Sequence, residues 1–240
     1  QKTNIFTNSE QVDLWSDRSN ISVVSNNLTS PSNILNADTA VPTSSASSHF
    51  IFNSFASVIN TSYSISVFAK ANGYNFLQVI SDSLGFSTGN FFNVNLITGA
   101  IGNSTLTTIS DILIEPFPNG WFKISFINTA SSTQSTARTI YAPLSTDSAN
   151  RLPSFIGNGT SGIALWGAST IISNDHYSYI PTTNAAVTRN EDVITATPPA
   201  GTVKITTTFS NNTTQVLTTI PATYTAPQGL IKSIVMDKVL

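Results

Sequence analysis

The chain has 240 residues, of which 40% are hydrophobic and 9% are charged, and its net charge is −2. With ten Lys and Arg residues and no basic cluster, it lacks the charge for binding through many phosphate contacts, which excludes nucleic acid and anionic lipid surfaces as partners. It has no cysteine, so disulfides and thiolate metal sites are excluded, and no apolar run is long enough to span a membrane.

Alternation of apolar and polar residues predicts β-strands along most of the chain, and helical periodicity is nearly absent. In residues 63–69 the apolar side chains fall at every second position and therefore share one face of a strand. The same alternation recurs in residues 92–96, 122–126 and 163–166. The Thr, Val, Ile and Phe in these segments suit a pleated, half-buried surface. We therefore expect an all-β protein.

Turn signals that contain Gly or Asn separate the expected strands. They lie at residues 71–73, 98–99, 118–120 and 157–159, and polar surface loops are expected at 42–48 and 129–136. Short strands with frequent turns are typical of a sandwich or barrel.

A domain boundary is expected near residues 195–201, because their paired prolines cannot enter a central strand. The sequence thus predicts a first domain over residues 1–193 and a β appendage over 194–240. Three further strands are expected in the appendage, near residues 203–206, 215–217 and 230–239.

Five segments, in their order and spacing along the chain, match the pattern of a known protein family. They are NIFTNSE (4–10) with Trp15 shortly after, YSISVFAKANGYNFLQV (63–79), FNVNLITGAIG (92–102), PNGWFKISF (118–126), and GNGTSGIALWGAS (157–169) followed by SYIPTTNAAVTRNEDV (178–193). Together they resemble the concanavalin A-like jelly-roll module of phage tail-fibre, tailspike and head-fibre proteins. The last pair of segments is the most specific, and Asn93 departs from the family pattern, which usually has Asp there.

The resemblance implies an antiparallel jelly-roll sandwich in a virion appendage, often trimeric and often credited with carbohydrate binding. It brings no catalytic residues with it, and we expect no cofactor. The expected function is that of a non-enzymatic tail-fibre or head-fibre module at the virion surface, whose partners are other virion proteins and a host-surface glycan. Three alternatives stay open: a purely structural capsid or tail decoration protein, a polysaccharide-degrading tailspike enzyme, and a bacterial surface adhesin.

The appendage lies outside the resemblance, but its last segment suggests assembly. Apolar residues occupy both faces of that segment: Ile231, Ile234, Val235, Met236, Val239 and Leu240. A strand that is buried on both faces needs cover on both sides. We expect the first domain to cover one face and a neighbouring subunit the other, which predicts a homotrimer or a symmetric array.

Two glycine motifs match enzyme signatures, but their context predicts turns. Residues 85–89 (GFSTG) match the nucleophile elbow of serine hydrolases, in which a helix follows the serine. Residues 157–162 (GNGTSG) match the dinucleotide-binding motif, which also needs a following helix. Each is followed instead by an alternating segment, so we interpret both as connections between strands.

The titratable residues suggest neither catalysis nor metal binding. The Asp175–His176 pair is read as part of a surface loop, because adjacency in sequence does not support a catalytic pair. The acids considered for glycoside hydrolysis do not cluster with aromatic residues; they are Asp82, Asp111, Glu115, Asp147, Glu191 and Asp192. Arg189 is expected to pair with Glu191 or Asp192. No calcium-loop spacing joins Asp82, Asn90 and Asp147, so we expect no metal.

Aromatic rings are the natural platforms for the apolar face of a sugar. Trp121 and Trp166 lie within expected strands and are predicted to be core residues. Tyr74, Tyr177 and Tyr179 lie near strand ends or in loops, and they are the candidate ligand-binding residues.

Overall fold

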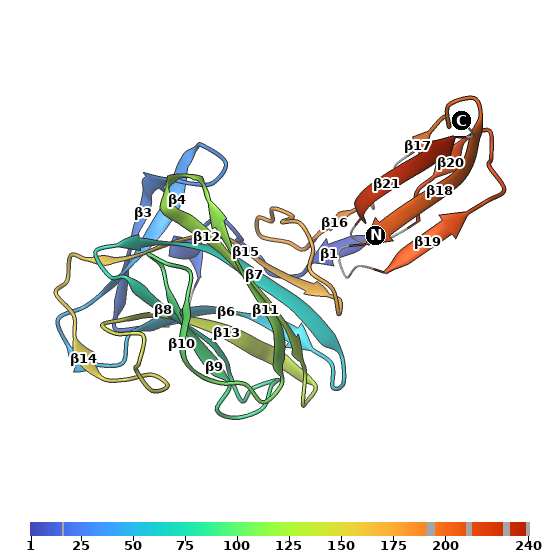
Figure 1. Ribbon diagram of the computed structural model, residues 1–240. Coiled ribbons are helices and arrows are strands. Elements are labelled where there is room, and N and C mark those ends of the chain that lie inside the picture. The colour runs from blue at the N-terminus through green and yellow to red at the C-terminus, as the bar shows by residue number, and fades with distance from the viewer. Residues whose placement is uncertain (16, 191–194, 210–212, 228–230, 239–240) are drawn as a thin grey trace. The chain divides into compact units, whose positions relative to one another are not determined.

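The computed structural model describes residues 1–15, 17–190, 195–209, 213–227 and 231–238, and Figure 1 shows it as a ribbon. The chain forms two compact units: a large unit, Lys2–Arg189, and a small unit, Gln1 with Asn190–Leu240. The boundary expected between residues 193 and 194 lies outside the described residues. Both units are built from antiparallel strand pairs, which confirms the predicted all-β class.

An eight-stranded sheet, sheet A, forms one side of the large unit. Its strands run in the order β11 (Ile109–Phe117), β12 (Trp121–Thr129), β7 (Ser62–Asn72), β15 (Gly162–Ile172), β1 (Lys2–Asn4) and β16 (Val187–Arg189), and β4 (Leu35–Pro42) joins β15 to β3 (Ile21–Thr29). The strand β1, from the start of the chain, thus lies between two strands from the end of the unit.

A six-stranded sheet, sheet B, forms the other side of the large unit. Its order is β10 (Ile101–Thr105), β9 (Phe91–Asn95), β8 (Phe76–Ser81), β13 (Gln134–Leu144), β6 (Phe50–Ser57) and β2 (Asp17–Ser19). A short pair, β5 (Ala46–Ser47) with β14 (Phe155–Ile156), and the single turns η1 (Val12–Leu14) and η2 (Pro118–Gly120) complete the unit. Two segments expected to be loops therefore include strand residues: 46–47 lie in β5 and 134–136 in β13.

The main hydrophobic core is built from one face of each sheet. Tyr63, Ile65, Val67 and Ala69 of β7 all enter it, and so do alternate residues of β9, β12 and β15. This confirms the faces predicted from the alternation of the sequence. The arrangement of two antiparallel sheets around a shared core is compatible with a β-sandwich.

A loop covers part of the outer face of sheet B. Leu152, in the loop of residues 145–154, packs with Phe50 against a buried cluster of Phe52, Ile80, Phe91 and Ile140. Side-chain amides hold this loop: Gln78 Oε1 accepts a hydrogen bond from the Leu152 amide at 2.7 Å, and Asn93 Nδ2 donates to the carbonyl of Asp147 at 2.8 Å.

The small unit contains a three-stranded sheet in the order β19 (Thr214–Leu217), β18 (Thr202–Phe209) and β21 (Ile231–Lys238). A second pair, β17 (Thr195–Ala196) with β20 (Tyr224–Thr225), adds two strands that the sequence did not predict. Ile205, Tyr224 and Ala226 form a small buried core within this unit, against which Ile234 and Met236 pack. One face of β21 is therefore covered by the small unit itself. Val239 and Leu240 lie outside the described residues.

Candidate functional site

Five aromatic residues gather on the outer face of sheet A and form what we call the aromatic cluster: Phe68, Phe117, Trp121, Trp166 and Tyr179. Phe68, Trp121 and Trp166 face away from the main core because they alternate with the inward residues of β7, β12 and β15. The ring of Phe68 lies at the centre, 5.0 Å from Phe117 and 5.4 Å from Trp166 between ring centroids. Both tryptophans are buried, as predicted.

Tyr179 joins this cluster from residues 173–186, which we call the covering loop. Its ring lies 5.0 Å from that of Trp166, and its hydroxyl contacts Ser9 Oγ at 2.7 Å and donates to Glu10 Oε1 at 3.1 Å. Burial raises the pKa of Tyr179, and the nearby Glu10 carboxylate raises it further. The phenol therefore stays protonated, and Tyr179 anchors the covering loop.

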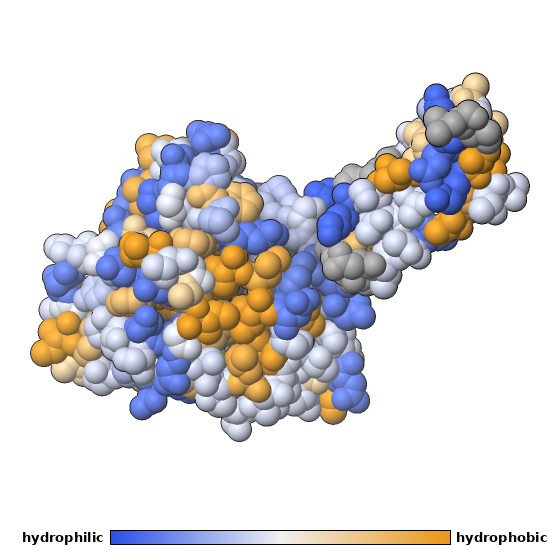
Figure 2. Space-filling model, in the orientation of Figure 1, coloured by the Kyte–Doolittle hydropathy of each residue, from blue (hydrophilic) through white to orange (hydrophobic). Residues whose placement is uncertain are grey.

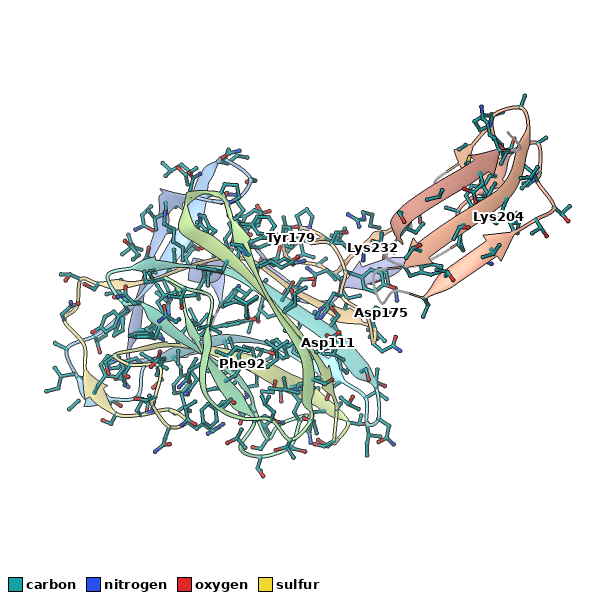
Figure 3. The ribbon with its side chains drawn as sticks, viewed as in Figure 1. Phe92, Asp111, Asp175, Tyr179, Lys204 and Lys232 are labelled. Carbon is teal, nitrogen blue, oxygen red and sulfur yellow. The ribbon has the colours of Figure 1, made fainter. Side chains whose placement is uncertain are left out.

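Polar contacts hold the preceding part of the covering loop. Lys123 Nζ donates to the carbonyl of Tyr177 at 3.4 Å and lies 3.7 Å from Glu115. His176 Nε2 lies 3.2 Å from Asp111 Oδ2, but the two atoms do not have hydrogen-bond geometry. Any attraction between these side chains is therefore electrostatic and needs a charged imidazole. Figure 3 labels Asp111, Asp175 and Tyr179 in this region. His176 thus pairs with a distant strand residue and not with its neighbour Asp175.

The three candidate tyrosines occupy two different places. Tyr177 and Tyr179 share the covering loop. Lys2 Nζ lies 4.4 Å from the centroid of the Tyr177 ring, so the Lys2 ammonium covers one face of that ring. Tyr74 follows β7; its amide donates to the carbonyl of Gly162 at 3.1 Å and its ring packs 5.7 Å from Phe155. None of the interactions found among the described residues joins Tyr74 to the other two.

A cleft of about 270 Å³ lies beside the aromatic cluster. Its lining residues come from four segments: Lys70, Ala71, Leu96, Ile97, Pro116, Phe117, Gly120, Trp121 and Phe122. Phe117 is 36% exposed and Ile97 is 62% exposed. Figure 2 shows hydrophobic side chains gathered on the face of the large unit where β10 to β12 lie in Figure 1. The cleft is thus an open, mostly apolar surface.

The turn between β9 and β10 fixes one wall of the cleft. Asn95 Oδ1 accepts hydrogen bonds from the amides of Ile97 and Thr98 at 2.9 and 3.2 Å. Gly99 has a φ of +76°, and a Cβ at this position would lie 2.8 Å from Cε1 of Phe122. Only glycine lets the turn approach Phe122 this closely, so the wall is set by local sequence.

Three of the acids considered for catalysis contact basic side chains. Asp82 contacts Arg138 Nε at 3.3 Å and Arg151 Nη2 at 3.4 Å, while Glu115 and Asp111 face Lys123 and His176. Glu191 and Asp192 lie outside the described residues, and so does their expected pairing with Arg189, whose described partner is Ser178. Within the described ranges, no group of three His, Cys, Asp or Glu residues could hold a metal ion.

The two glycine motifs are connections between strands, as predicted. Residues 85–89 join β8 to β9, and residues 157–162 join β14 to the start of β15. Neither is followed by a helix. His49, the other histidine, is buried between the carbonyls of Asn20 and Phe155, at 2.8 and 2.9 Å from its ring nitrogens, and has a structural role.

Sequence reasoning did not identify the cleft. Lys70, Ile97 and Phe117 are far apart in the chain, and none belongs to a recognisable binding motif. The available signal was weak: Phe117 continues the outward-facing positions of β11 and carries a large ring where a polar residue is usual.

The sequence matches no protein-family model and no curated protein. Across the residues that the structure describes, we find no helix long and apolar enough to cross a membrane.

Proposed function

We propose that the chain is a non-enzymatic module of a phage virion appendage, a tail or head fibre, that binds carbohydrate on the host surface. The observation that carries the binding role is the open apolar cleft beside the aromatic cluster. A concave, largely apolar surface with a few polar groups is the usual form of a small-ligand site. The virion setting rests on the sequence resemblance.

The finer fold that we propose is a concanavalin A-like jelly roll. Its support is the strand order, in which neighbours in space are often distant in sequence: β7 lies between β12 and β15, and β13 lies between β8 and β6. Such crossing connections between two packed antiparallel sheets are a feature of jelly rolls.

The chemistry of the cleft suits a sugar ring. The C–H face of a pyranose is apolar and can pack against the exposed ring of Phe117 and the side chain of Ile97, while its hydroxyl groups stay in water or reach backbone groups at the rim. Catalysis is not proposed, because glycoside hydrolysis uses two carboxylates that flank the bond, and Lys70 is the one charged group among the lining residues.

A second candidate function, a structural decoration protein of the capsid or tail, is favoured by the small unit. Val216 and Val235 lie on either side of Thr206 in one row of its sheet, and both are about half exposed. Exposed apolar rows of this kind occur at contacts between proteins.

The binding role can be tested with the full chain and purified host-surface polysaccharides. We expect measurable binding that is weakened about tenfold by Phe117→Ala, a loss of about 1.4 kcal/mol. Ile156→Ala is the matched control, since it removes an exposed apolar side chain that does not line the cleft. The length of the polysaccharide should not change during the incubation.

The same assay separates the cleft from the sites predicted from sequence. If Tyr74→Ala or Tyr177→Ala abolishes binding while Phe117→Ala has no effect, the ligand occupies one of those tyrosines and the cleft is the wrong site. Shortening of the polysaccharide would contradict a non-enzymatic role, and the absence of binding to any polysaccharide would favour the structural candidate.

A further inference from the structure

Lys70 differs from every other residue that lines the cleft. It is the one charged side chain among the nine lining residues. It forms no ion pair among the described residues. By contrast, Lys123, which lies opposite Phe68 in the same sheet, forms an ion pair with Glu115 at 3.7 Å. Lys70 therefore brings an unbalanced positive charge to a mostly apolar wall.

The position of Lys70 in the sheet places its side chain at the cleft. In β7 it alternates with the inward residue Ala69, and it lies on the outer face beside Trp121 of β12. Its Cε lies 3.8 Å from the point where a Cβ on Gly120 would stand. The side chain thus lies close to Gly120 of the η2 turn, which also lines the cleft.

We propose that the cleft selects acidic sugars, with the sugar carboxylate bound by Lys70 and the apolar face of the ring packed on Phe117 and Ile97. The inference rests on the proposed carbohydrate-binding function and names its ligand class. A charge-assisted hydrogen bond is about twice as strong as a neutral one, and an apolar wall reduces its screening by water. A neutral sugar at the same place leaves the Lys70 ammonium without a partner.

The test uses matched pairs of oligosaccharides: oligogalacturonate, oligomannuronate and oligosialate, each with its carboxyl-reduced, neutral form. Affinities for the full chain are measured by calorimetry at low and at high salt. We expect at least one acidic oligosaccharide to bind about tenfold more tightly than its neutral form. That preference should shrink as salt rises, because counterions screen the partly exposed ammonium.

Two variants separate charge from packing. Lys70→Met keeps the apolar stem and removes the charge, so it should abolish the preference for the acidic form over the neutral form. Lys70→Arg keeps the charge and should retain the preference.

The outcomes distinguish failure of the acid preference from failure of the carbohydrate-binding function. Equal binding of acidic and neutral forms overturns acid recognition and leaves the carbohydrate-binding function standing. An acid preference that survives Lys70→Met overturns the role of Lys70. The carboxylate would then be bound by another cationic side chain, such as Arg138 or Arg151, which both contact Asp82. No binding of any of the oligosaccharides or of the host-surface polysaccharides overturns both proposals.

Discussion

At the scale of single residues, Asn93 shows how one amide can hold a loop. The Leu152 amide donates to Gln78 Oε1, so Gln78 Nε2 must point to Asn93, where it donates to Oδ1 at 2.7 Å. Asn93 Nδ2 then donates to the carbonyls of Asp147 and Ala149 at 2.8 and 2.7 Å. The orientation of both amides is therefore fixed by backbone groups. This gives a physical reason for an amide instead of a carboxylate at position 93.

We predict that Asn93→Asp destabilises the large unit by about 3 kcal/mol or more, because a buried carboxylate would face two carbonyl oxygens. Asn158→Asp is the matched control: the Oδ1 atom of Asn158 accepts from the amides of Thr160 and Ser161, a role that a carboxylate keeps. Its expected cost is within about 0.5 kcal/mol.

Urea unfolding followed by tryptophan fluorescence measures both variants. The three tryptophans, Trp15, Trp121 and Trp166, all lie in the large unit, so the signal is independent of the small unit. Equal stabilities of the two variants would show that the loop of residues 145–154 does not depend on the Asn93 amide.

At the scale of elements, the bulge in β15 lets the covering loop approach sheet A. The pairing of β15 with β7 shifts between Trp166 and Ser169. Gly167 lies in this shift with a φ of +64°, and a Cβ there would stand 2.9 Å from Phe68 Cδ2 and 3.5 Å from Tyr179 Cζ. The bulge therefore gives Tyr179 room to pack against Phe68, and it anchors the covering loop on the aromatic cluster.

We predict that Gly167→Ala destabilises the large unit by about 2–4 kcal/mol, through a left-handed backbone and a clash with Phe68. In Gly159→Ala the φ is similar, +70°, but no atom lies within 4 Å of the added Cβ. That control should cost only about 1 kcal/mol, the backbone part alone. Chemical unfolding of both variants gives the difference, and equal costs would mean that the covering loop moves aside freely.

The strands could be predicted from the sequence, and the cleft could not. The alternation in residues 63–69 reports which side chains share a face, because that depends only on the pleat of one strand. The position of Lys70 beside Trp121 depends on which strands pair, and that is a property of the whole sheet. The contact of His176 with Asp111 has the same origin. The burial of Trp121 and Trp166 was predictable because each lies inside a recognisable strand.

At the scale of the whole molecule, the small unit has one covered and one open face. Ile234 and Met236 of β21 pack on the buried Ile205 and Tyr224, whereas Val235 faces outward beside Thr206. Within the described residues, the small unit's own core covers one side of this strand, and the row of Val216 and Val235 lies on the other side. The expectation that the first domain covers one face of the strand stays a prediction.

We predict that the full chain self-associates, as a trimer, through this row. The double variant Val216→Ser and Val235→Ser should then sediment as a monomer, because it removes apolar area from the contact. The matched control is Val24→Ser with Val58→Ser, two valines of similar exposure in the large unit. Sedimentation velocity over a range of concentrations measures both. A wild-type chain that stays monomeric throughout would contradict the trimer and the role of this row.

The place of β1 has a consequence for the time course of folding during synthesis. Lys2, Thr3 and Asn4 pair with residues 187–189, and the Asn4 side chain bonds to the backbone of Thr170 and Ile180. The first residues of the large unit must therefore wait on the ribosome until almost all of it has been translated. At about 5–20 residues per second, the delay is on the order of ten to forty seconds. During that interval β1 lacks its two partner strands, so this sheet is completed last, and the unpaired β1 is open to capture by a chaperone.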